Sequence, residues 1–183
     1  MDSPKILVNK DGFLFSLVKK NQYQVKFHIE NKHIFVSKIV DFSMVKLIYD
    51  LNTDIYEKVD INRLNENEII LTLLITHFFE DLGMSQKFSY IHMKKVVETD
   101  RILFNAQSIK SQRPDGMPEG SELLSIQGLN CICSILTPHS ITFSVDVVFD
   151  KESEIPGFAE KMIGVVLLKM FTRVKQFIEN IRM

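Results

Sequence analysis

The segment from His139 to Phe149 constrains the fold more than any other part of the chain, because apolar and polar side chains alternate along it. A period of two with one polar face is typical of a strand in an antiparallel sheet that has one face in solvent. The buried face of this strand is predicted to carry Ile141, Phe143, Val145, Val147 and Phe149. The sequence therefore predicts an antiparallel sheet immediately before the C-terminal segment.

A long helix is predicted after this strand, from Pro156 to about Ile181. Proline suits the first turn of a helix, where its missing N–H has no intrahelical partner. The first half carries extra apolar residues, Phe158, Val165 and Leu168, which indicate either a deeply buried helix or one that covers a lipid-sized cavity. Apolar residues at steps of three and four form a stripe that covers a sheet: Ala159, Ile163, Val166, Met170, Val174, Phe177 and Ile181.

Length and composition favour a single domain over residues 1–183, since a chain of this length buries roughly 70% of its unfolded surface. The 22 basic and 23 acidic residues form no basic block, so nucleic acid is not an expected partner. No stretch approaches the ~20 apolar residues of a membrane span, and residues 1–10 lack the apolar core of a signal peptide. A cytoplasmic monomer is therefore expected.

The rest of the chain is predicted to supply more strands of the same sheet and one short helix. A first hairpin is expected from Gln24–Glu30 and His33–Val40, followed by a helix that Asp41 or Ser43 caps and that ends near Leu51. Further strands, about eight in all, are expected at Val59–Leu64, Glu68–Thr76, Phe88–Val97, Arg101–Lys110 and Leu123–Leu136.

Two connections, His77–Ser85 and Ser111–Gly120, are longer than hairpins require. Long loops in compact domains are often functional. The fold class that follows from these elements is α+β, with a curved antiparallel sheet wrapped around a long C-terminal helix and a short helix after the first strands.

Residue types that catalysis or metal binding requires are present, but not at the necessary spacing. The five histidines are scattered, and the seven glycines form no phosphate-binding loop. Cys131 and Cys133 leave the same face of a strand, which fits a disulfide poorly, so they are interpreted as small buried apolar residues. No catalytic residue, metal site or cofactor is therefore expected.

An internal cavity is expected where a curved sheet is closed by a single helix. The available wall residues are mainly Phe, Ile, Leu, Met and Val, and apolar pockets with few polar groups bind apolar ligands. His92 shares a strand face with Phe88 and Tyr90, so it is either an inward-pointing polar contact or a hydrogen-bonded core histidine.

Six short segments, spread over nearly the whole chain, carry a likeness to a known family. They are Asp50–Glu57 (DLNTDIYE), Lys87–Ser89 (KFS), Arg101–Ser108 (RILFNAQS), Ser111–Gly120 (SQRPDGMPEG), Gly128–Cys131 (GLNC) and Asp150–Pro156 (DKESEIP). Together with the order of the elements, they resemble the StAR-related lipid-transfer (START) domains, which belong to the helix-grip, birch-pollen-allergen-like superfamily.

The resemblance implies a non-enzymatic carrier that holds one lipid beneath the last helix. The loop Ser111–Gly120 resembles the START loop that gates the ligand together with that helix. The residues expected to contact the lipid are Phe88, Tyr90, His92, Phe104, Ile141, Phe143, Val145, Phe158, Met162 and Val166, and the expected gate residues are Gln112, Pro114, Met117 and Pro118.

The resemblance also bears on the lipid and on membranes. A phospholipid is favoured over a sterol, because sterol-binding members pair a basic residue at the place of His92 with an acid, and Ile70–Ile75 offers none. Transient membrane contact is expected through apolar loop residues, with nearby cations meeting anionic headgroups. The residues expected there are Phe78, Phe79 and Met117, with the cations Lys161, Lys169 and Arg173.

Two other functions remain open. A helix-grip cyclase or hydrolase acting on a small apolar substrate needs an inward acid–base pair, for which the candidates are His92 with Tyr90 or with a loop carboxylate. A protein-interaction module of the same fold has a collapsed cavity and an exposed apolar patch.

Overall fold

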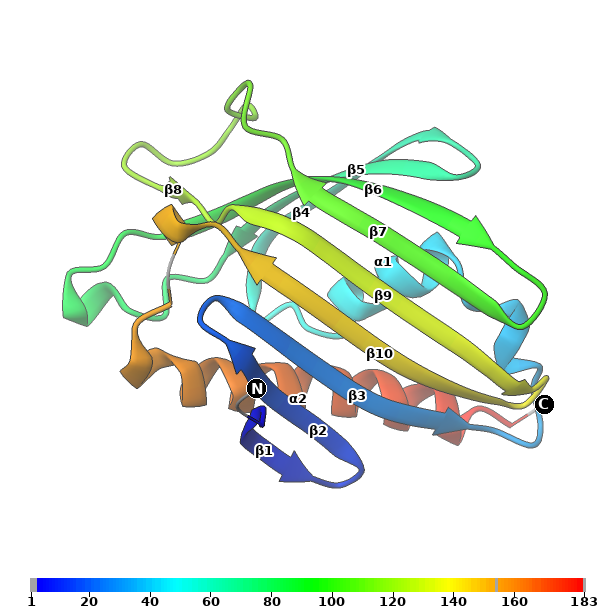
Figure 1. The fold of residues 1–183 in the computed structure, drawn as a ribbon. Coiled ribbons are helices and arrows are strands. Elements are labelled where there is room, and N and C mark those ends of the chain that lie inside the picture. Colours follow the sequence, from blue (N-terminus) through cyan, green and yellow to red (C-terminus); the bar gives the residue numbers. More distant parts are fainter. Residues whose placement is uncertain (1–2, 154, 183) are drawn as a thin grey trace.

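The computed structural model describes residues 3–153 and 155–182, and these form one large sheet that curves around two α-helices (Figure 1). The strands are β1 (Lys5–Lys10), β2 (Phe13–Lys19), β3 (Gln22–Glu30), β4 (Tyr56–Asn65), β5 (Glu68–Ile75), β6 (Lys87–Val97), β7 (Arg101–Ser108), β8 (Glu122–Leu123), β9 (Ile126–Thr137) and β10 (Ser140–Phe149). The helices are α1 (Phe42–Asp50) and α2 (Gly157–Asn180), and 3₁₀ turns lie at Val36–Lys38, Glu80–Leu82 and Lys151–Ser153. The α+β helix-grip architecture predicted from the sequence is confirmed.

The strand order of the sheet is β1-β2-β3-β10-β9-β7-β6-β5-β4, and neighbours along this path are antiparallel. The two-residue strand β8 pairs in parallel with the start of β6. Both helices lie on the concave face, and α2 runs along the side formed by β1, β2 and β3 (Figure 1). The space between the concave face and the helices is therefore the interior of the molecule.

The pairing of β3 with β10 joins the N-terminal strands to the rest of the sheet. Its ladder aligns Gln22–Glu30 with Ser140–Val148 without a register shift. The predicted second strand, His33–Val40, is wrong, because Asn31 turns the chain toward the end of α2. The Asn31 side chain accepts a hydrogen bond from the His33 amide at 2.7 Å and donates one to the Ile178 carbonyl at 2.6 Å.

The strands β1 and β2 form a hairpin that the sequence-based prediction did not include. Its turn is Asp11-Gly12, and both residues have positive φ, at 53° and 80°. This is the combination that two-residue hairpin loops require and that Asp-Gly readily adopts. Asn21, at φ 64°, then turns the chain from β2 into β3. The sheet thus has ten strands in the described residues, against about eight expected.

The other predicted elements agree closely with the structure. Asp41 caps α1, accepting a hydrogen bond from the Ser43 amide at 2.7 Å, as predicted. The predicted strand Leu123–Leu136 is divided into β8 and β9. Residues 1–2, 154 and 183 lie outside the described part of the chain, and the single domain expected over residues 1–183 stays a prediction.

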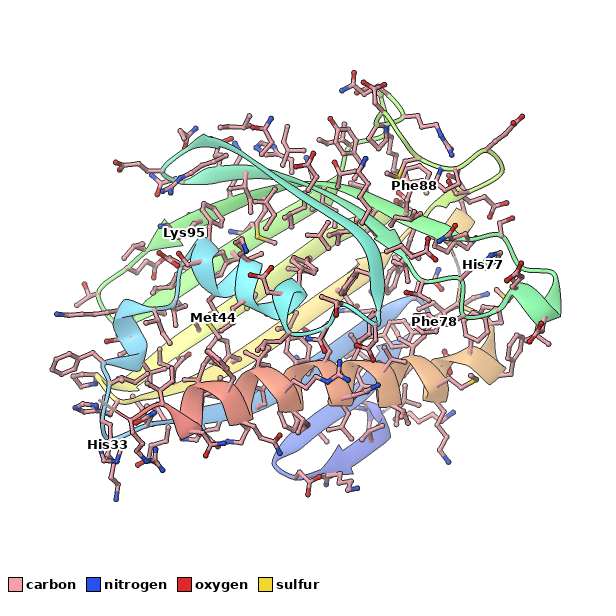
Figure 2. All side chains as sticks on the ribbon, turned by 180° about the vertical axis from the view of Figure 1, so that it is seen from behind. His33, Met44, His77, Phe78, Phe88 and Lys95 are labelled. Carbon is pink, nitrogen blue, oxygen red and sulfur yellow. The ribbon has the colours of Figure 1, made fainter. Side chains whose placement is uncertain are left out.

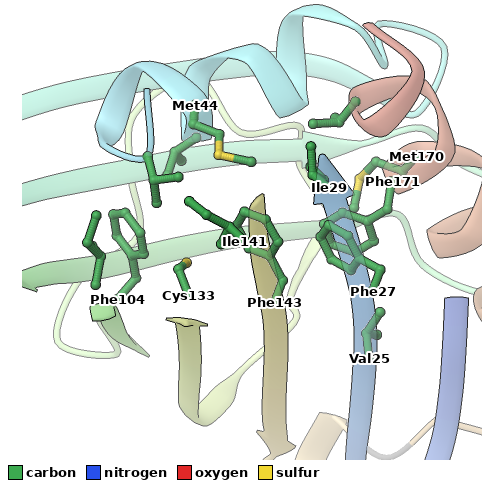
Figure 3. Packing of buried hydrophobic residues seen from close by; sticks show 14 of the residues in the cluster. Val25, Phe27, Ile29, Met44, Phe104, Cys133, Ile141, Phe143, Met170 and Phe171 are labelled. Carbon is green, nitrogen blue, oxygen red and sulfur yellow. The ribbon is translucent and has the colours of Figure 1, made fainter. Parts of the chain in front are cut away.

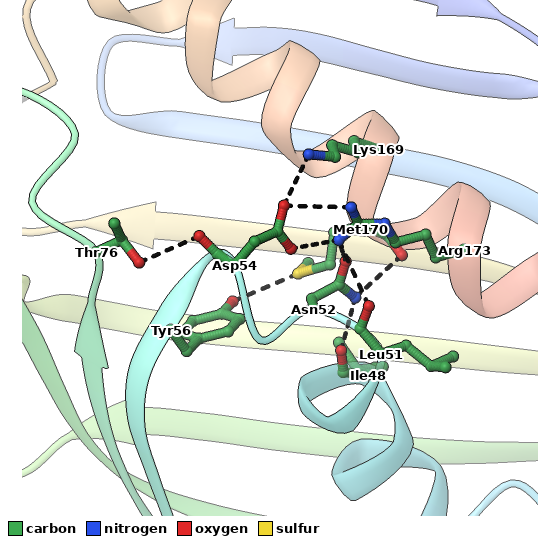
Figure 4. Close-up of polar contacts among 9 residues, drawn as sticks. All are labelled: Ile48, Leu51, Asn52, Asp54, Tyr56, Thr76, Lys169, Met170 and Arg173. Carbon is green, nitrogen blue, oxygen red and sulfur yellow. Dashed lines mark hydrogen bonds and ion pairs between the residues drawn. The ribbon is translucent and has the colours of Figure 1, made fainter.

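A buried polar cluster ties the end of α1 to the middle of α2 (Figure 4). The fully buried side chain of Asn52 donates to the Ile48 carbonyl at 2.7 Å and to the Met170 carbonyl at 3.3 Å, and accepts from Arg173 at 3.0 Å. Buried amides are stable only when such partners are present. This cluster fixes the distance between the two helices that cover the sheet.

A close approach fixes α2 against the N-terminal hairpin. A Cβ atom added at Gly164 would lie 2.7 Å from the Phe15 ring and 3.1 Å from a Val8 methyl carbon. Only glycine leaves room for this contact, which accounts for a residue with poor helix propensity in mid-helix. Gly164 therefore sets how closely α2 packs on β1 and β2.

Candidate lipid-binding cavity

A cavity of about 530 Å³ lies between the concave face of the sheet and the two helices. Its volume falls within the range of about 300–1,000 Å³ that is typical of small-molecule sites. The sheet contributes alternate residues, as a period of two requires: Phe15, Val25, Phe27, Leu73, Ile91, Met93, Phe104, Cys131, Cys133, Phe143 and Val145. The helices contribute Met44, Val45, Ile48, Val166, Leu167, Met170 and Phe171.

An aromatic layer packs the second half of α2 onto the sheet (Figure 3). The ring of Phe27 stacks on Phe143, with centroids 4.8 Å apart, and Phe171 of α2 packs on Phe27 at 4.9 Å. The second half of α2 also buries Val174 and Ile178 completely, and residues of both halves line the cavity, from Ala159 to Val174. The extra apolar residues noted in the first half do not line the cavity: Phe158 and Val165 are exposed, and Leu168 packs against the core.

Half of the residues predicted to contact the lipid line this cavity. They are Phe104, Phe143, Val145, Met162 and Val166. Ile141 is fully buried on the same face of β10, but it packs in the hydrophobic core and is not among the lining residues. Phe158 lies at the surface of the first turn of α2, where its ring makes an edge contact with Phe79.

The inward orientation expected for Phe88, Tyr90 and His92 is not found, and their placement is corrected here. The residues of β6 that line the cavity are Ser89, Ile91 and Met93, each one position after a residue predicted to face inward. Phe88 and Tyr90 instead form a second apolar cluster on the outer face, with Leu74. Both faces of β6 are apolar at this end, so alternation alone did not distinguish the inner face from the outer one.

His92 lies on the outer face of the sheet, where its Nε2 is 2.7 Å from Oε2 of Glu68 on β5. The hydrogen bond from His92 is the main reason that the pKa of the Glu68 carboxyl is lowered. The inward acid–base pair of His92 with Tyr90 that a cyclase or hydrolase needs is therefore not formed.

The loop predicted to gate the cavity covers the outer cluster instead. Gln112 donates to the Tyr90 hydroxyl at 3.1 Å, and Met117 packs against the outer cluster. The Arg113 guanidinium lies 4.8 Å above the Phe88 ring and donates to the Pro118 carbonyl at 2.7 Å. None of Gln112, Pro114, Met117 and Pro118 lines the cavity in the described structure, so their placement at a gate is corrected.

The mouth of the cavity lies between the β5–β6 connection, residues 76–86, and the start of α2 (Figure 2). His77, Phe78 and Phe79 line it on the loop side, and Pro156 and Ala159 line it on the helix side. The His77 ring contacts the Met84 carbonyl at 2.5 Å and holds the loop closed on itself. The sequence signal for this mouth was the long apolar connection His77–Ser85, which the gate prediction did not use.

An exposed apolar surface surrounds the mouth, and we call it the mouth patch. The loop contributes Phe78 and Leu82, and α2 contributes Phe158, Met162 and Val165, each between 46 and 62% exposed. The edge contact of Phe79 with Phe158, at 6.4 Å, brings loop and helix together there. An apolar patch of this kind on a folded domain is typical of a binding surface.

Seven hydroxyl-bearing residues line the cavity in the described structure, and four of them, Tyr23, Thr76, Ser85 and Ser153, donate to acceptors in the protein. Tyr49 of α1 and Tyr56 of β4 meet edge to face with ring centroids 5.0 Å apart, and Ser89 lies on β6. Burial raises the pKa of both tyrosines, so both phenols stay neutral. The thiols of Cys131 and Cys133 are 3.7 Å apart and free; the hydrogen bond between them and burial raise the pKa of Cys133.

Two of the cations expected to meet lipid headgroups are bound within the protein (Figure 4). The Lys169 ammonium lies 2.7 Å from Asp54, and the Arg173 guanidinium forms an ion pair with the same carboxylate. Lys161 is exposed near the mouth patch. The expectation that Lys169 and Arg173 serve headgroups is therefore corrected: they hold α2 to the α1–β4 connection.

The described residues contain neither a metal-binding cluster nor a membrane-spanning helix. In this part of the chain no three His, Cys, Asp or Glu side chains are grouped so that they could hold a metal ion. No helix among residues 3–153 and 155–182 is both long and apolar enough to cross a membrane.

No family model matches the chain, and no curated protein sequence matches it. The structure of the human StarD13 (DLC2) lipid transfer and protein localization domain is similar, with a TM-score of 0.73 at 8% identity over 99% of this chain and 91% of that one. Human StAR-related lipid transfer protein 5 is similar with a TM-score of 0.70 at 12% identity over 97% of this chain and 87% of that one.

A more distant likeness extends to an enzyme. A Thalictrum flavum norcoclaurine synthase variant gives a TM-score of 0.51 at 14% identity, covering 88% of this chain and 96% of the synthase. The structural likeness is thus considerably greater to the lipid-transfer domains. The chain has the fold of the StAR-related lipid-transfer domains.

Proposed function

We propose that this protein is a non-enzymatic carrier that holds one acyl-chain lipid in its internal cavity and exchanges it at membranes. The observation that carries the proposal is the cavity itself, about 530 Å³ of mainly apolar space beneath α2. Each methylene group transferred from water into such a space contributes about 0.8 kcal/mol, so one acyl chain supplies enough free energy for retention. The START fold of the chain supports a lipid as the ligand class.

The mouth patch supports the second half of the proposal, exchange at a membrane. Phe78 and Leu82 on the loop and Phe158 on α2 border the opening through which a lipid would pass. Insertion of these side chains into the interface would remove apolar surface from water at the opening itself. We propose a cytoplasmic monomer that contacts membranes transiently and returns to solution with its lipid.

The ligand is proposed to carry an acyl chain rather than a sterol ring system. Met44, Met93, Met162 and Met170 line the cavity, and flexible thioether side chains adapt to chains of different length and bend. The phospholipid expected from the sequence belongs to this class. The polar residues of the cavity bear on the headgroup.

Native mass spectrometry of the purified protein tests the proposal. We expect the wild-type protein to carry one lipid, or to acquire one from mixed vesicles. Val145→Phe places a larger side chain in the cavity wall and is expected to abolish or strongly reduce this loading, because Val145 faces the cavity from the centre of β10. Ser144→Phe adds the same ring to the opposite face of that strand and is the matched control. A wild-type protein that stays free of lipid after incubation with vesicles would refute the carrier function.

A further inference from the structure

Two tyrosine hydroxyls face the cavity without a strong hydrogen-bond acceptor. Among the residues that the structure describes, the Tyr49 hydroxyl makes no hydrogen bond, and its ring lines the cavity. The Tyr56 hydroxyl donates only to the thioether sulfur of Met170, at 3.4 Å. A thioether is a weak acceptor, so both phenols retain donor capacity that the protein does not use.

A third hydroxyl lies on the same wall of the cavity. Ser89 is buried on β6 and faces inward, and its hydroxyl has no partner within the described structure. The strand β5 alone separates β6 from β4, where Tyr56 lies, so the two strands are roughly 10 Å apart. Hydroxyl groups without a strong acceptor in the protein therefore lie together on one side of the cavity, which is formed by β4, β5, β6 and α1.

Hydroxyls that line a cavity without a protein acceptor are open to water or to a ligand, and enclosing them in an apolar ligand site without a new acceptor lowers stability. Buried tyrosines in particular almost always find a partner for the phenol. Oxygen atoms of a bound ligand would supply the missing acceptors. The location of these hydroxyls inside a cavity, rather than in a packed core, fits that function.

Lys87 and His77 line the cavity, but both have partners within the protein, which for His77 is the Met84 carbonyl. Lys169 and Arg173 are paired with Asp54 outside it, and the Lys87 ammonium lies 2.5 Å from Glu122. Asp41, at the start of α1, adds an acidic side chain to the wall. A phosphate or carboxylate held at Tyr49 would be a buried anion without a countercharge, which is strongly unfavourable.

We infer that the ligand is an uncharged acyl lipid with ester or hydroxyl oxygens, such as a monoacylglycerol, whose polar end binds the hydroxyls of Tyr49, Tyr56 and Ser89. This inference rests on the proposed carrier function and names its ligand class. It replaces the phospholipid expected from the sequence. Since burial keeps the phenols protonated, they act as donors at every physiological pH.

The experiment compares lipids that share one chain and differ in the headgroup. Delipidated protein is titrated with monopalmitoylglycerol, palmitate or palmitoyl lysophosphatidylcholine, and displacement of Nile red from the cavity is measured. We expect monopalmitoylglycerol to bind at least tenfold more tightly than palmitate. Tyr49→Phe and Tyr56→Phe are each expected to weaken monopalmitoylglycerol binding by roughly three- to tenfold, the effect of one hydrogen bond.

The control is Tyr90→Phe, which removes a hydroxyl from the outer face of the sheet and leaves all affinities unchanged. Tyr49→Phe is further expected to leave the melting temperature of the lipid-free protein unchanged or to raise it, since no intramolecular hydrogen bond is lost. Equal or tighter binding of palmitate or the lysophospholipid, or unchanged binding by both tyrosine variants, would overturn the inference and leave the carrier function standing. Failure of all three lipids to bind would overturn both.

Discussion

At the scale of single residues, Asp54 shows how charge is used in this protein. It binds Lys169 and Arg173 of α2 (Figure 4), and the hydrogen bond from Arg173, followed by that from Lys169, lowers the pKa of the Asp54 carboxyl far below its usual value. A carboxyl whose pKa is lowered in the folded state stabilises that state above the pKa of the unfolded chain, about 3.9. That contribution is lost as the pH falls below this value.

We therefore expect Asp54→Asn to lower the free energy of unfolding at pH 7, and the difference from the wild type to shrink as the pH falls below about 4. Urea unfolding of both proteins across this pH range measures it. The ion pairs of Asp54 with Lys169 and Arg173 are half exposed, so solvent screening keeps the effect on stability modest. A difference that stayed constant down to the lowest pH would show that the ion pairs do not contribute.

Residue placement could be predicted where local chemistry decides it, and not where tertiary contacts do. The cap of α1 was narrowed to Asp41 or Ser43, because short polar side chains bond nearby backbone amides, and in the structure Asp41 is the cap. Phe88, Tyr90 and His92 were assigned to the wrong face, because the loop that buries the outer side of β6 comes from residues far along the chain. Nothing in the local sequence indicates which of two apolar faces a distant loop will cover.

At the scale of secondary-structure elements, two opposite effects decide how a substitution at Gly164 changes stability. Alanine at this position improves helix propensity by about 1 kcal/mol, but its Cβ would overlap the Phe15 ring at 2.7 Å. Overpacking of a core typically costs about 1–3 kcal/mol. Because the overlap involves a buried ring, we expect Gly164→Ala to lower the free energy of unfolding by about 1 kcal/mol net.

Chemical unfolding of Gly164→Ala beside Gly157→Ala measures this balance. A Cβ at Gly157 meets nothing within 4 Å, so that variant is expected to be neutral or slightly stabilising. A higher midpoint for Gly164→Ala than for the wild type would mean that α2 moves away from β2 at little cost. The packing of helix and hairpin would then be looser than the structure indicates.

Element type was predictable wherever the periodicity is strong and the element long. The helix Gly157–Asn180 and the strand Ser140–Phe149 were predicted almost to their ends. The hairpin of β1 and β2 was missed although Asp11-Gly12 between apolar runs is a strong signal for it. His33–Val40 was assigned to a strand because its apolar residues suit one, whereas the tertiary contact of Asn31 with α2 redirects the chain.

At the scale of the whole molecule, the cavity could be expected from the fold, but its opening could not. A curved sheet with one long helix implies an interior, and the wall residues of β7 and β10 follow from alternation. The side on which the loop Ser111–Gly120 lies depends on the outer apolar cluster around Phe88, which the sequence does not place. The β5–β6 connection borders the mouth instead.

Membrane exchange makes a prediction at this scale. Leu82→Asp and Phe158→Asp are each expected to slow lipid transfer between vesicles about tenfold, because each removes an apolar side chain worth about 1.5–3 kcal/mol on insertion. Transfer by the wild type is expected to depend little on salt, since Glu80 and Asp81 on the loop give the mouth patch no cationic excess. A fluorescence assay of transfer between vesicles measures both.

Leu136→Asp is the matched control for the two mouth variants. Leu136 is just as exposed but lies near the end of β9, at the opposite end of the sheet from the mouth (Figure 1). Equal slowing by all three substitutions would show that the effect is not specific to the mouth. Strong acceleration of transfer by low salt would indicate an electrostatic docking mode instead.

The pairing of β3 with β10 has a consequence for how the protein is made. Gln24 bonds Asp146 across 122 positions, so the first three strands have no neighbour on the β3 side until β10 has left the ribosome. Contacts between such distant residues form slowly, because a long loop must close before they stabilise anything. The unpaired edge of β3 is meanwhile a site for wrong partners. The cavity is thus completed only after β10 has joined both halves of the sheet and α2 has closed over it.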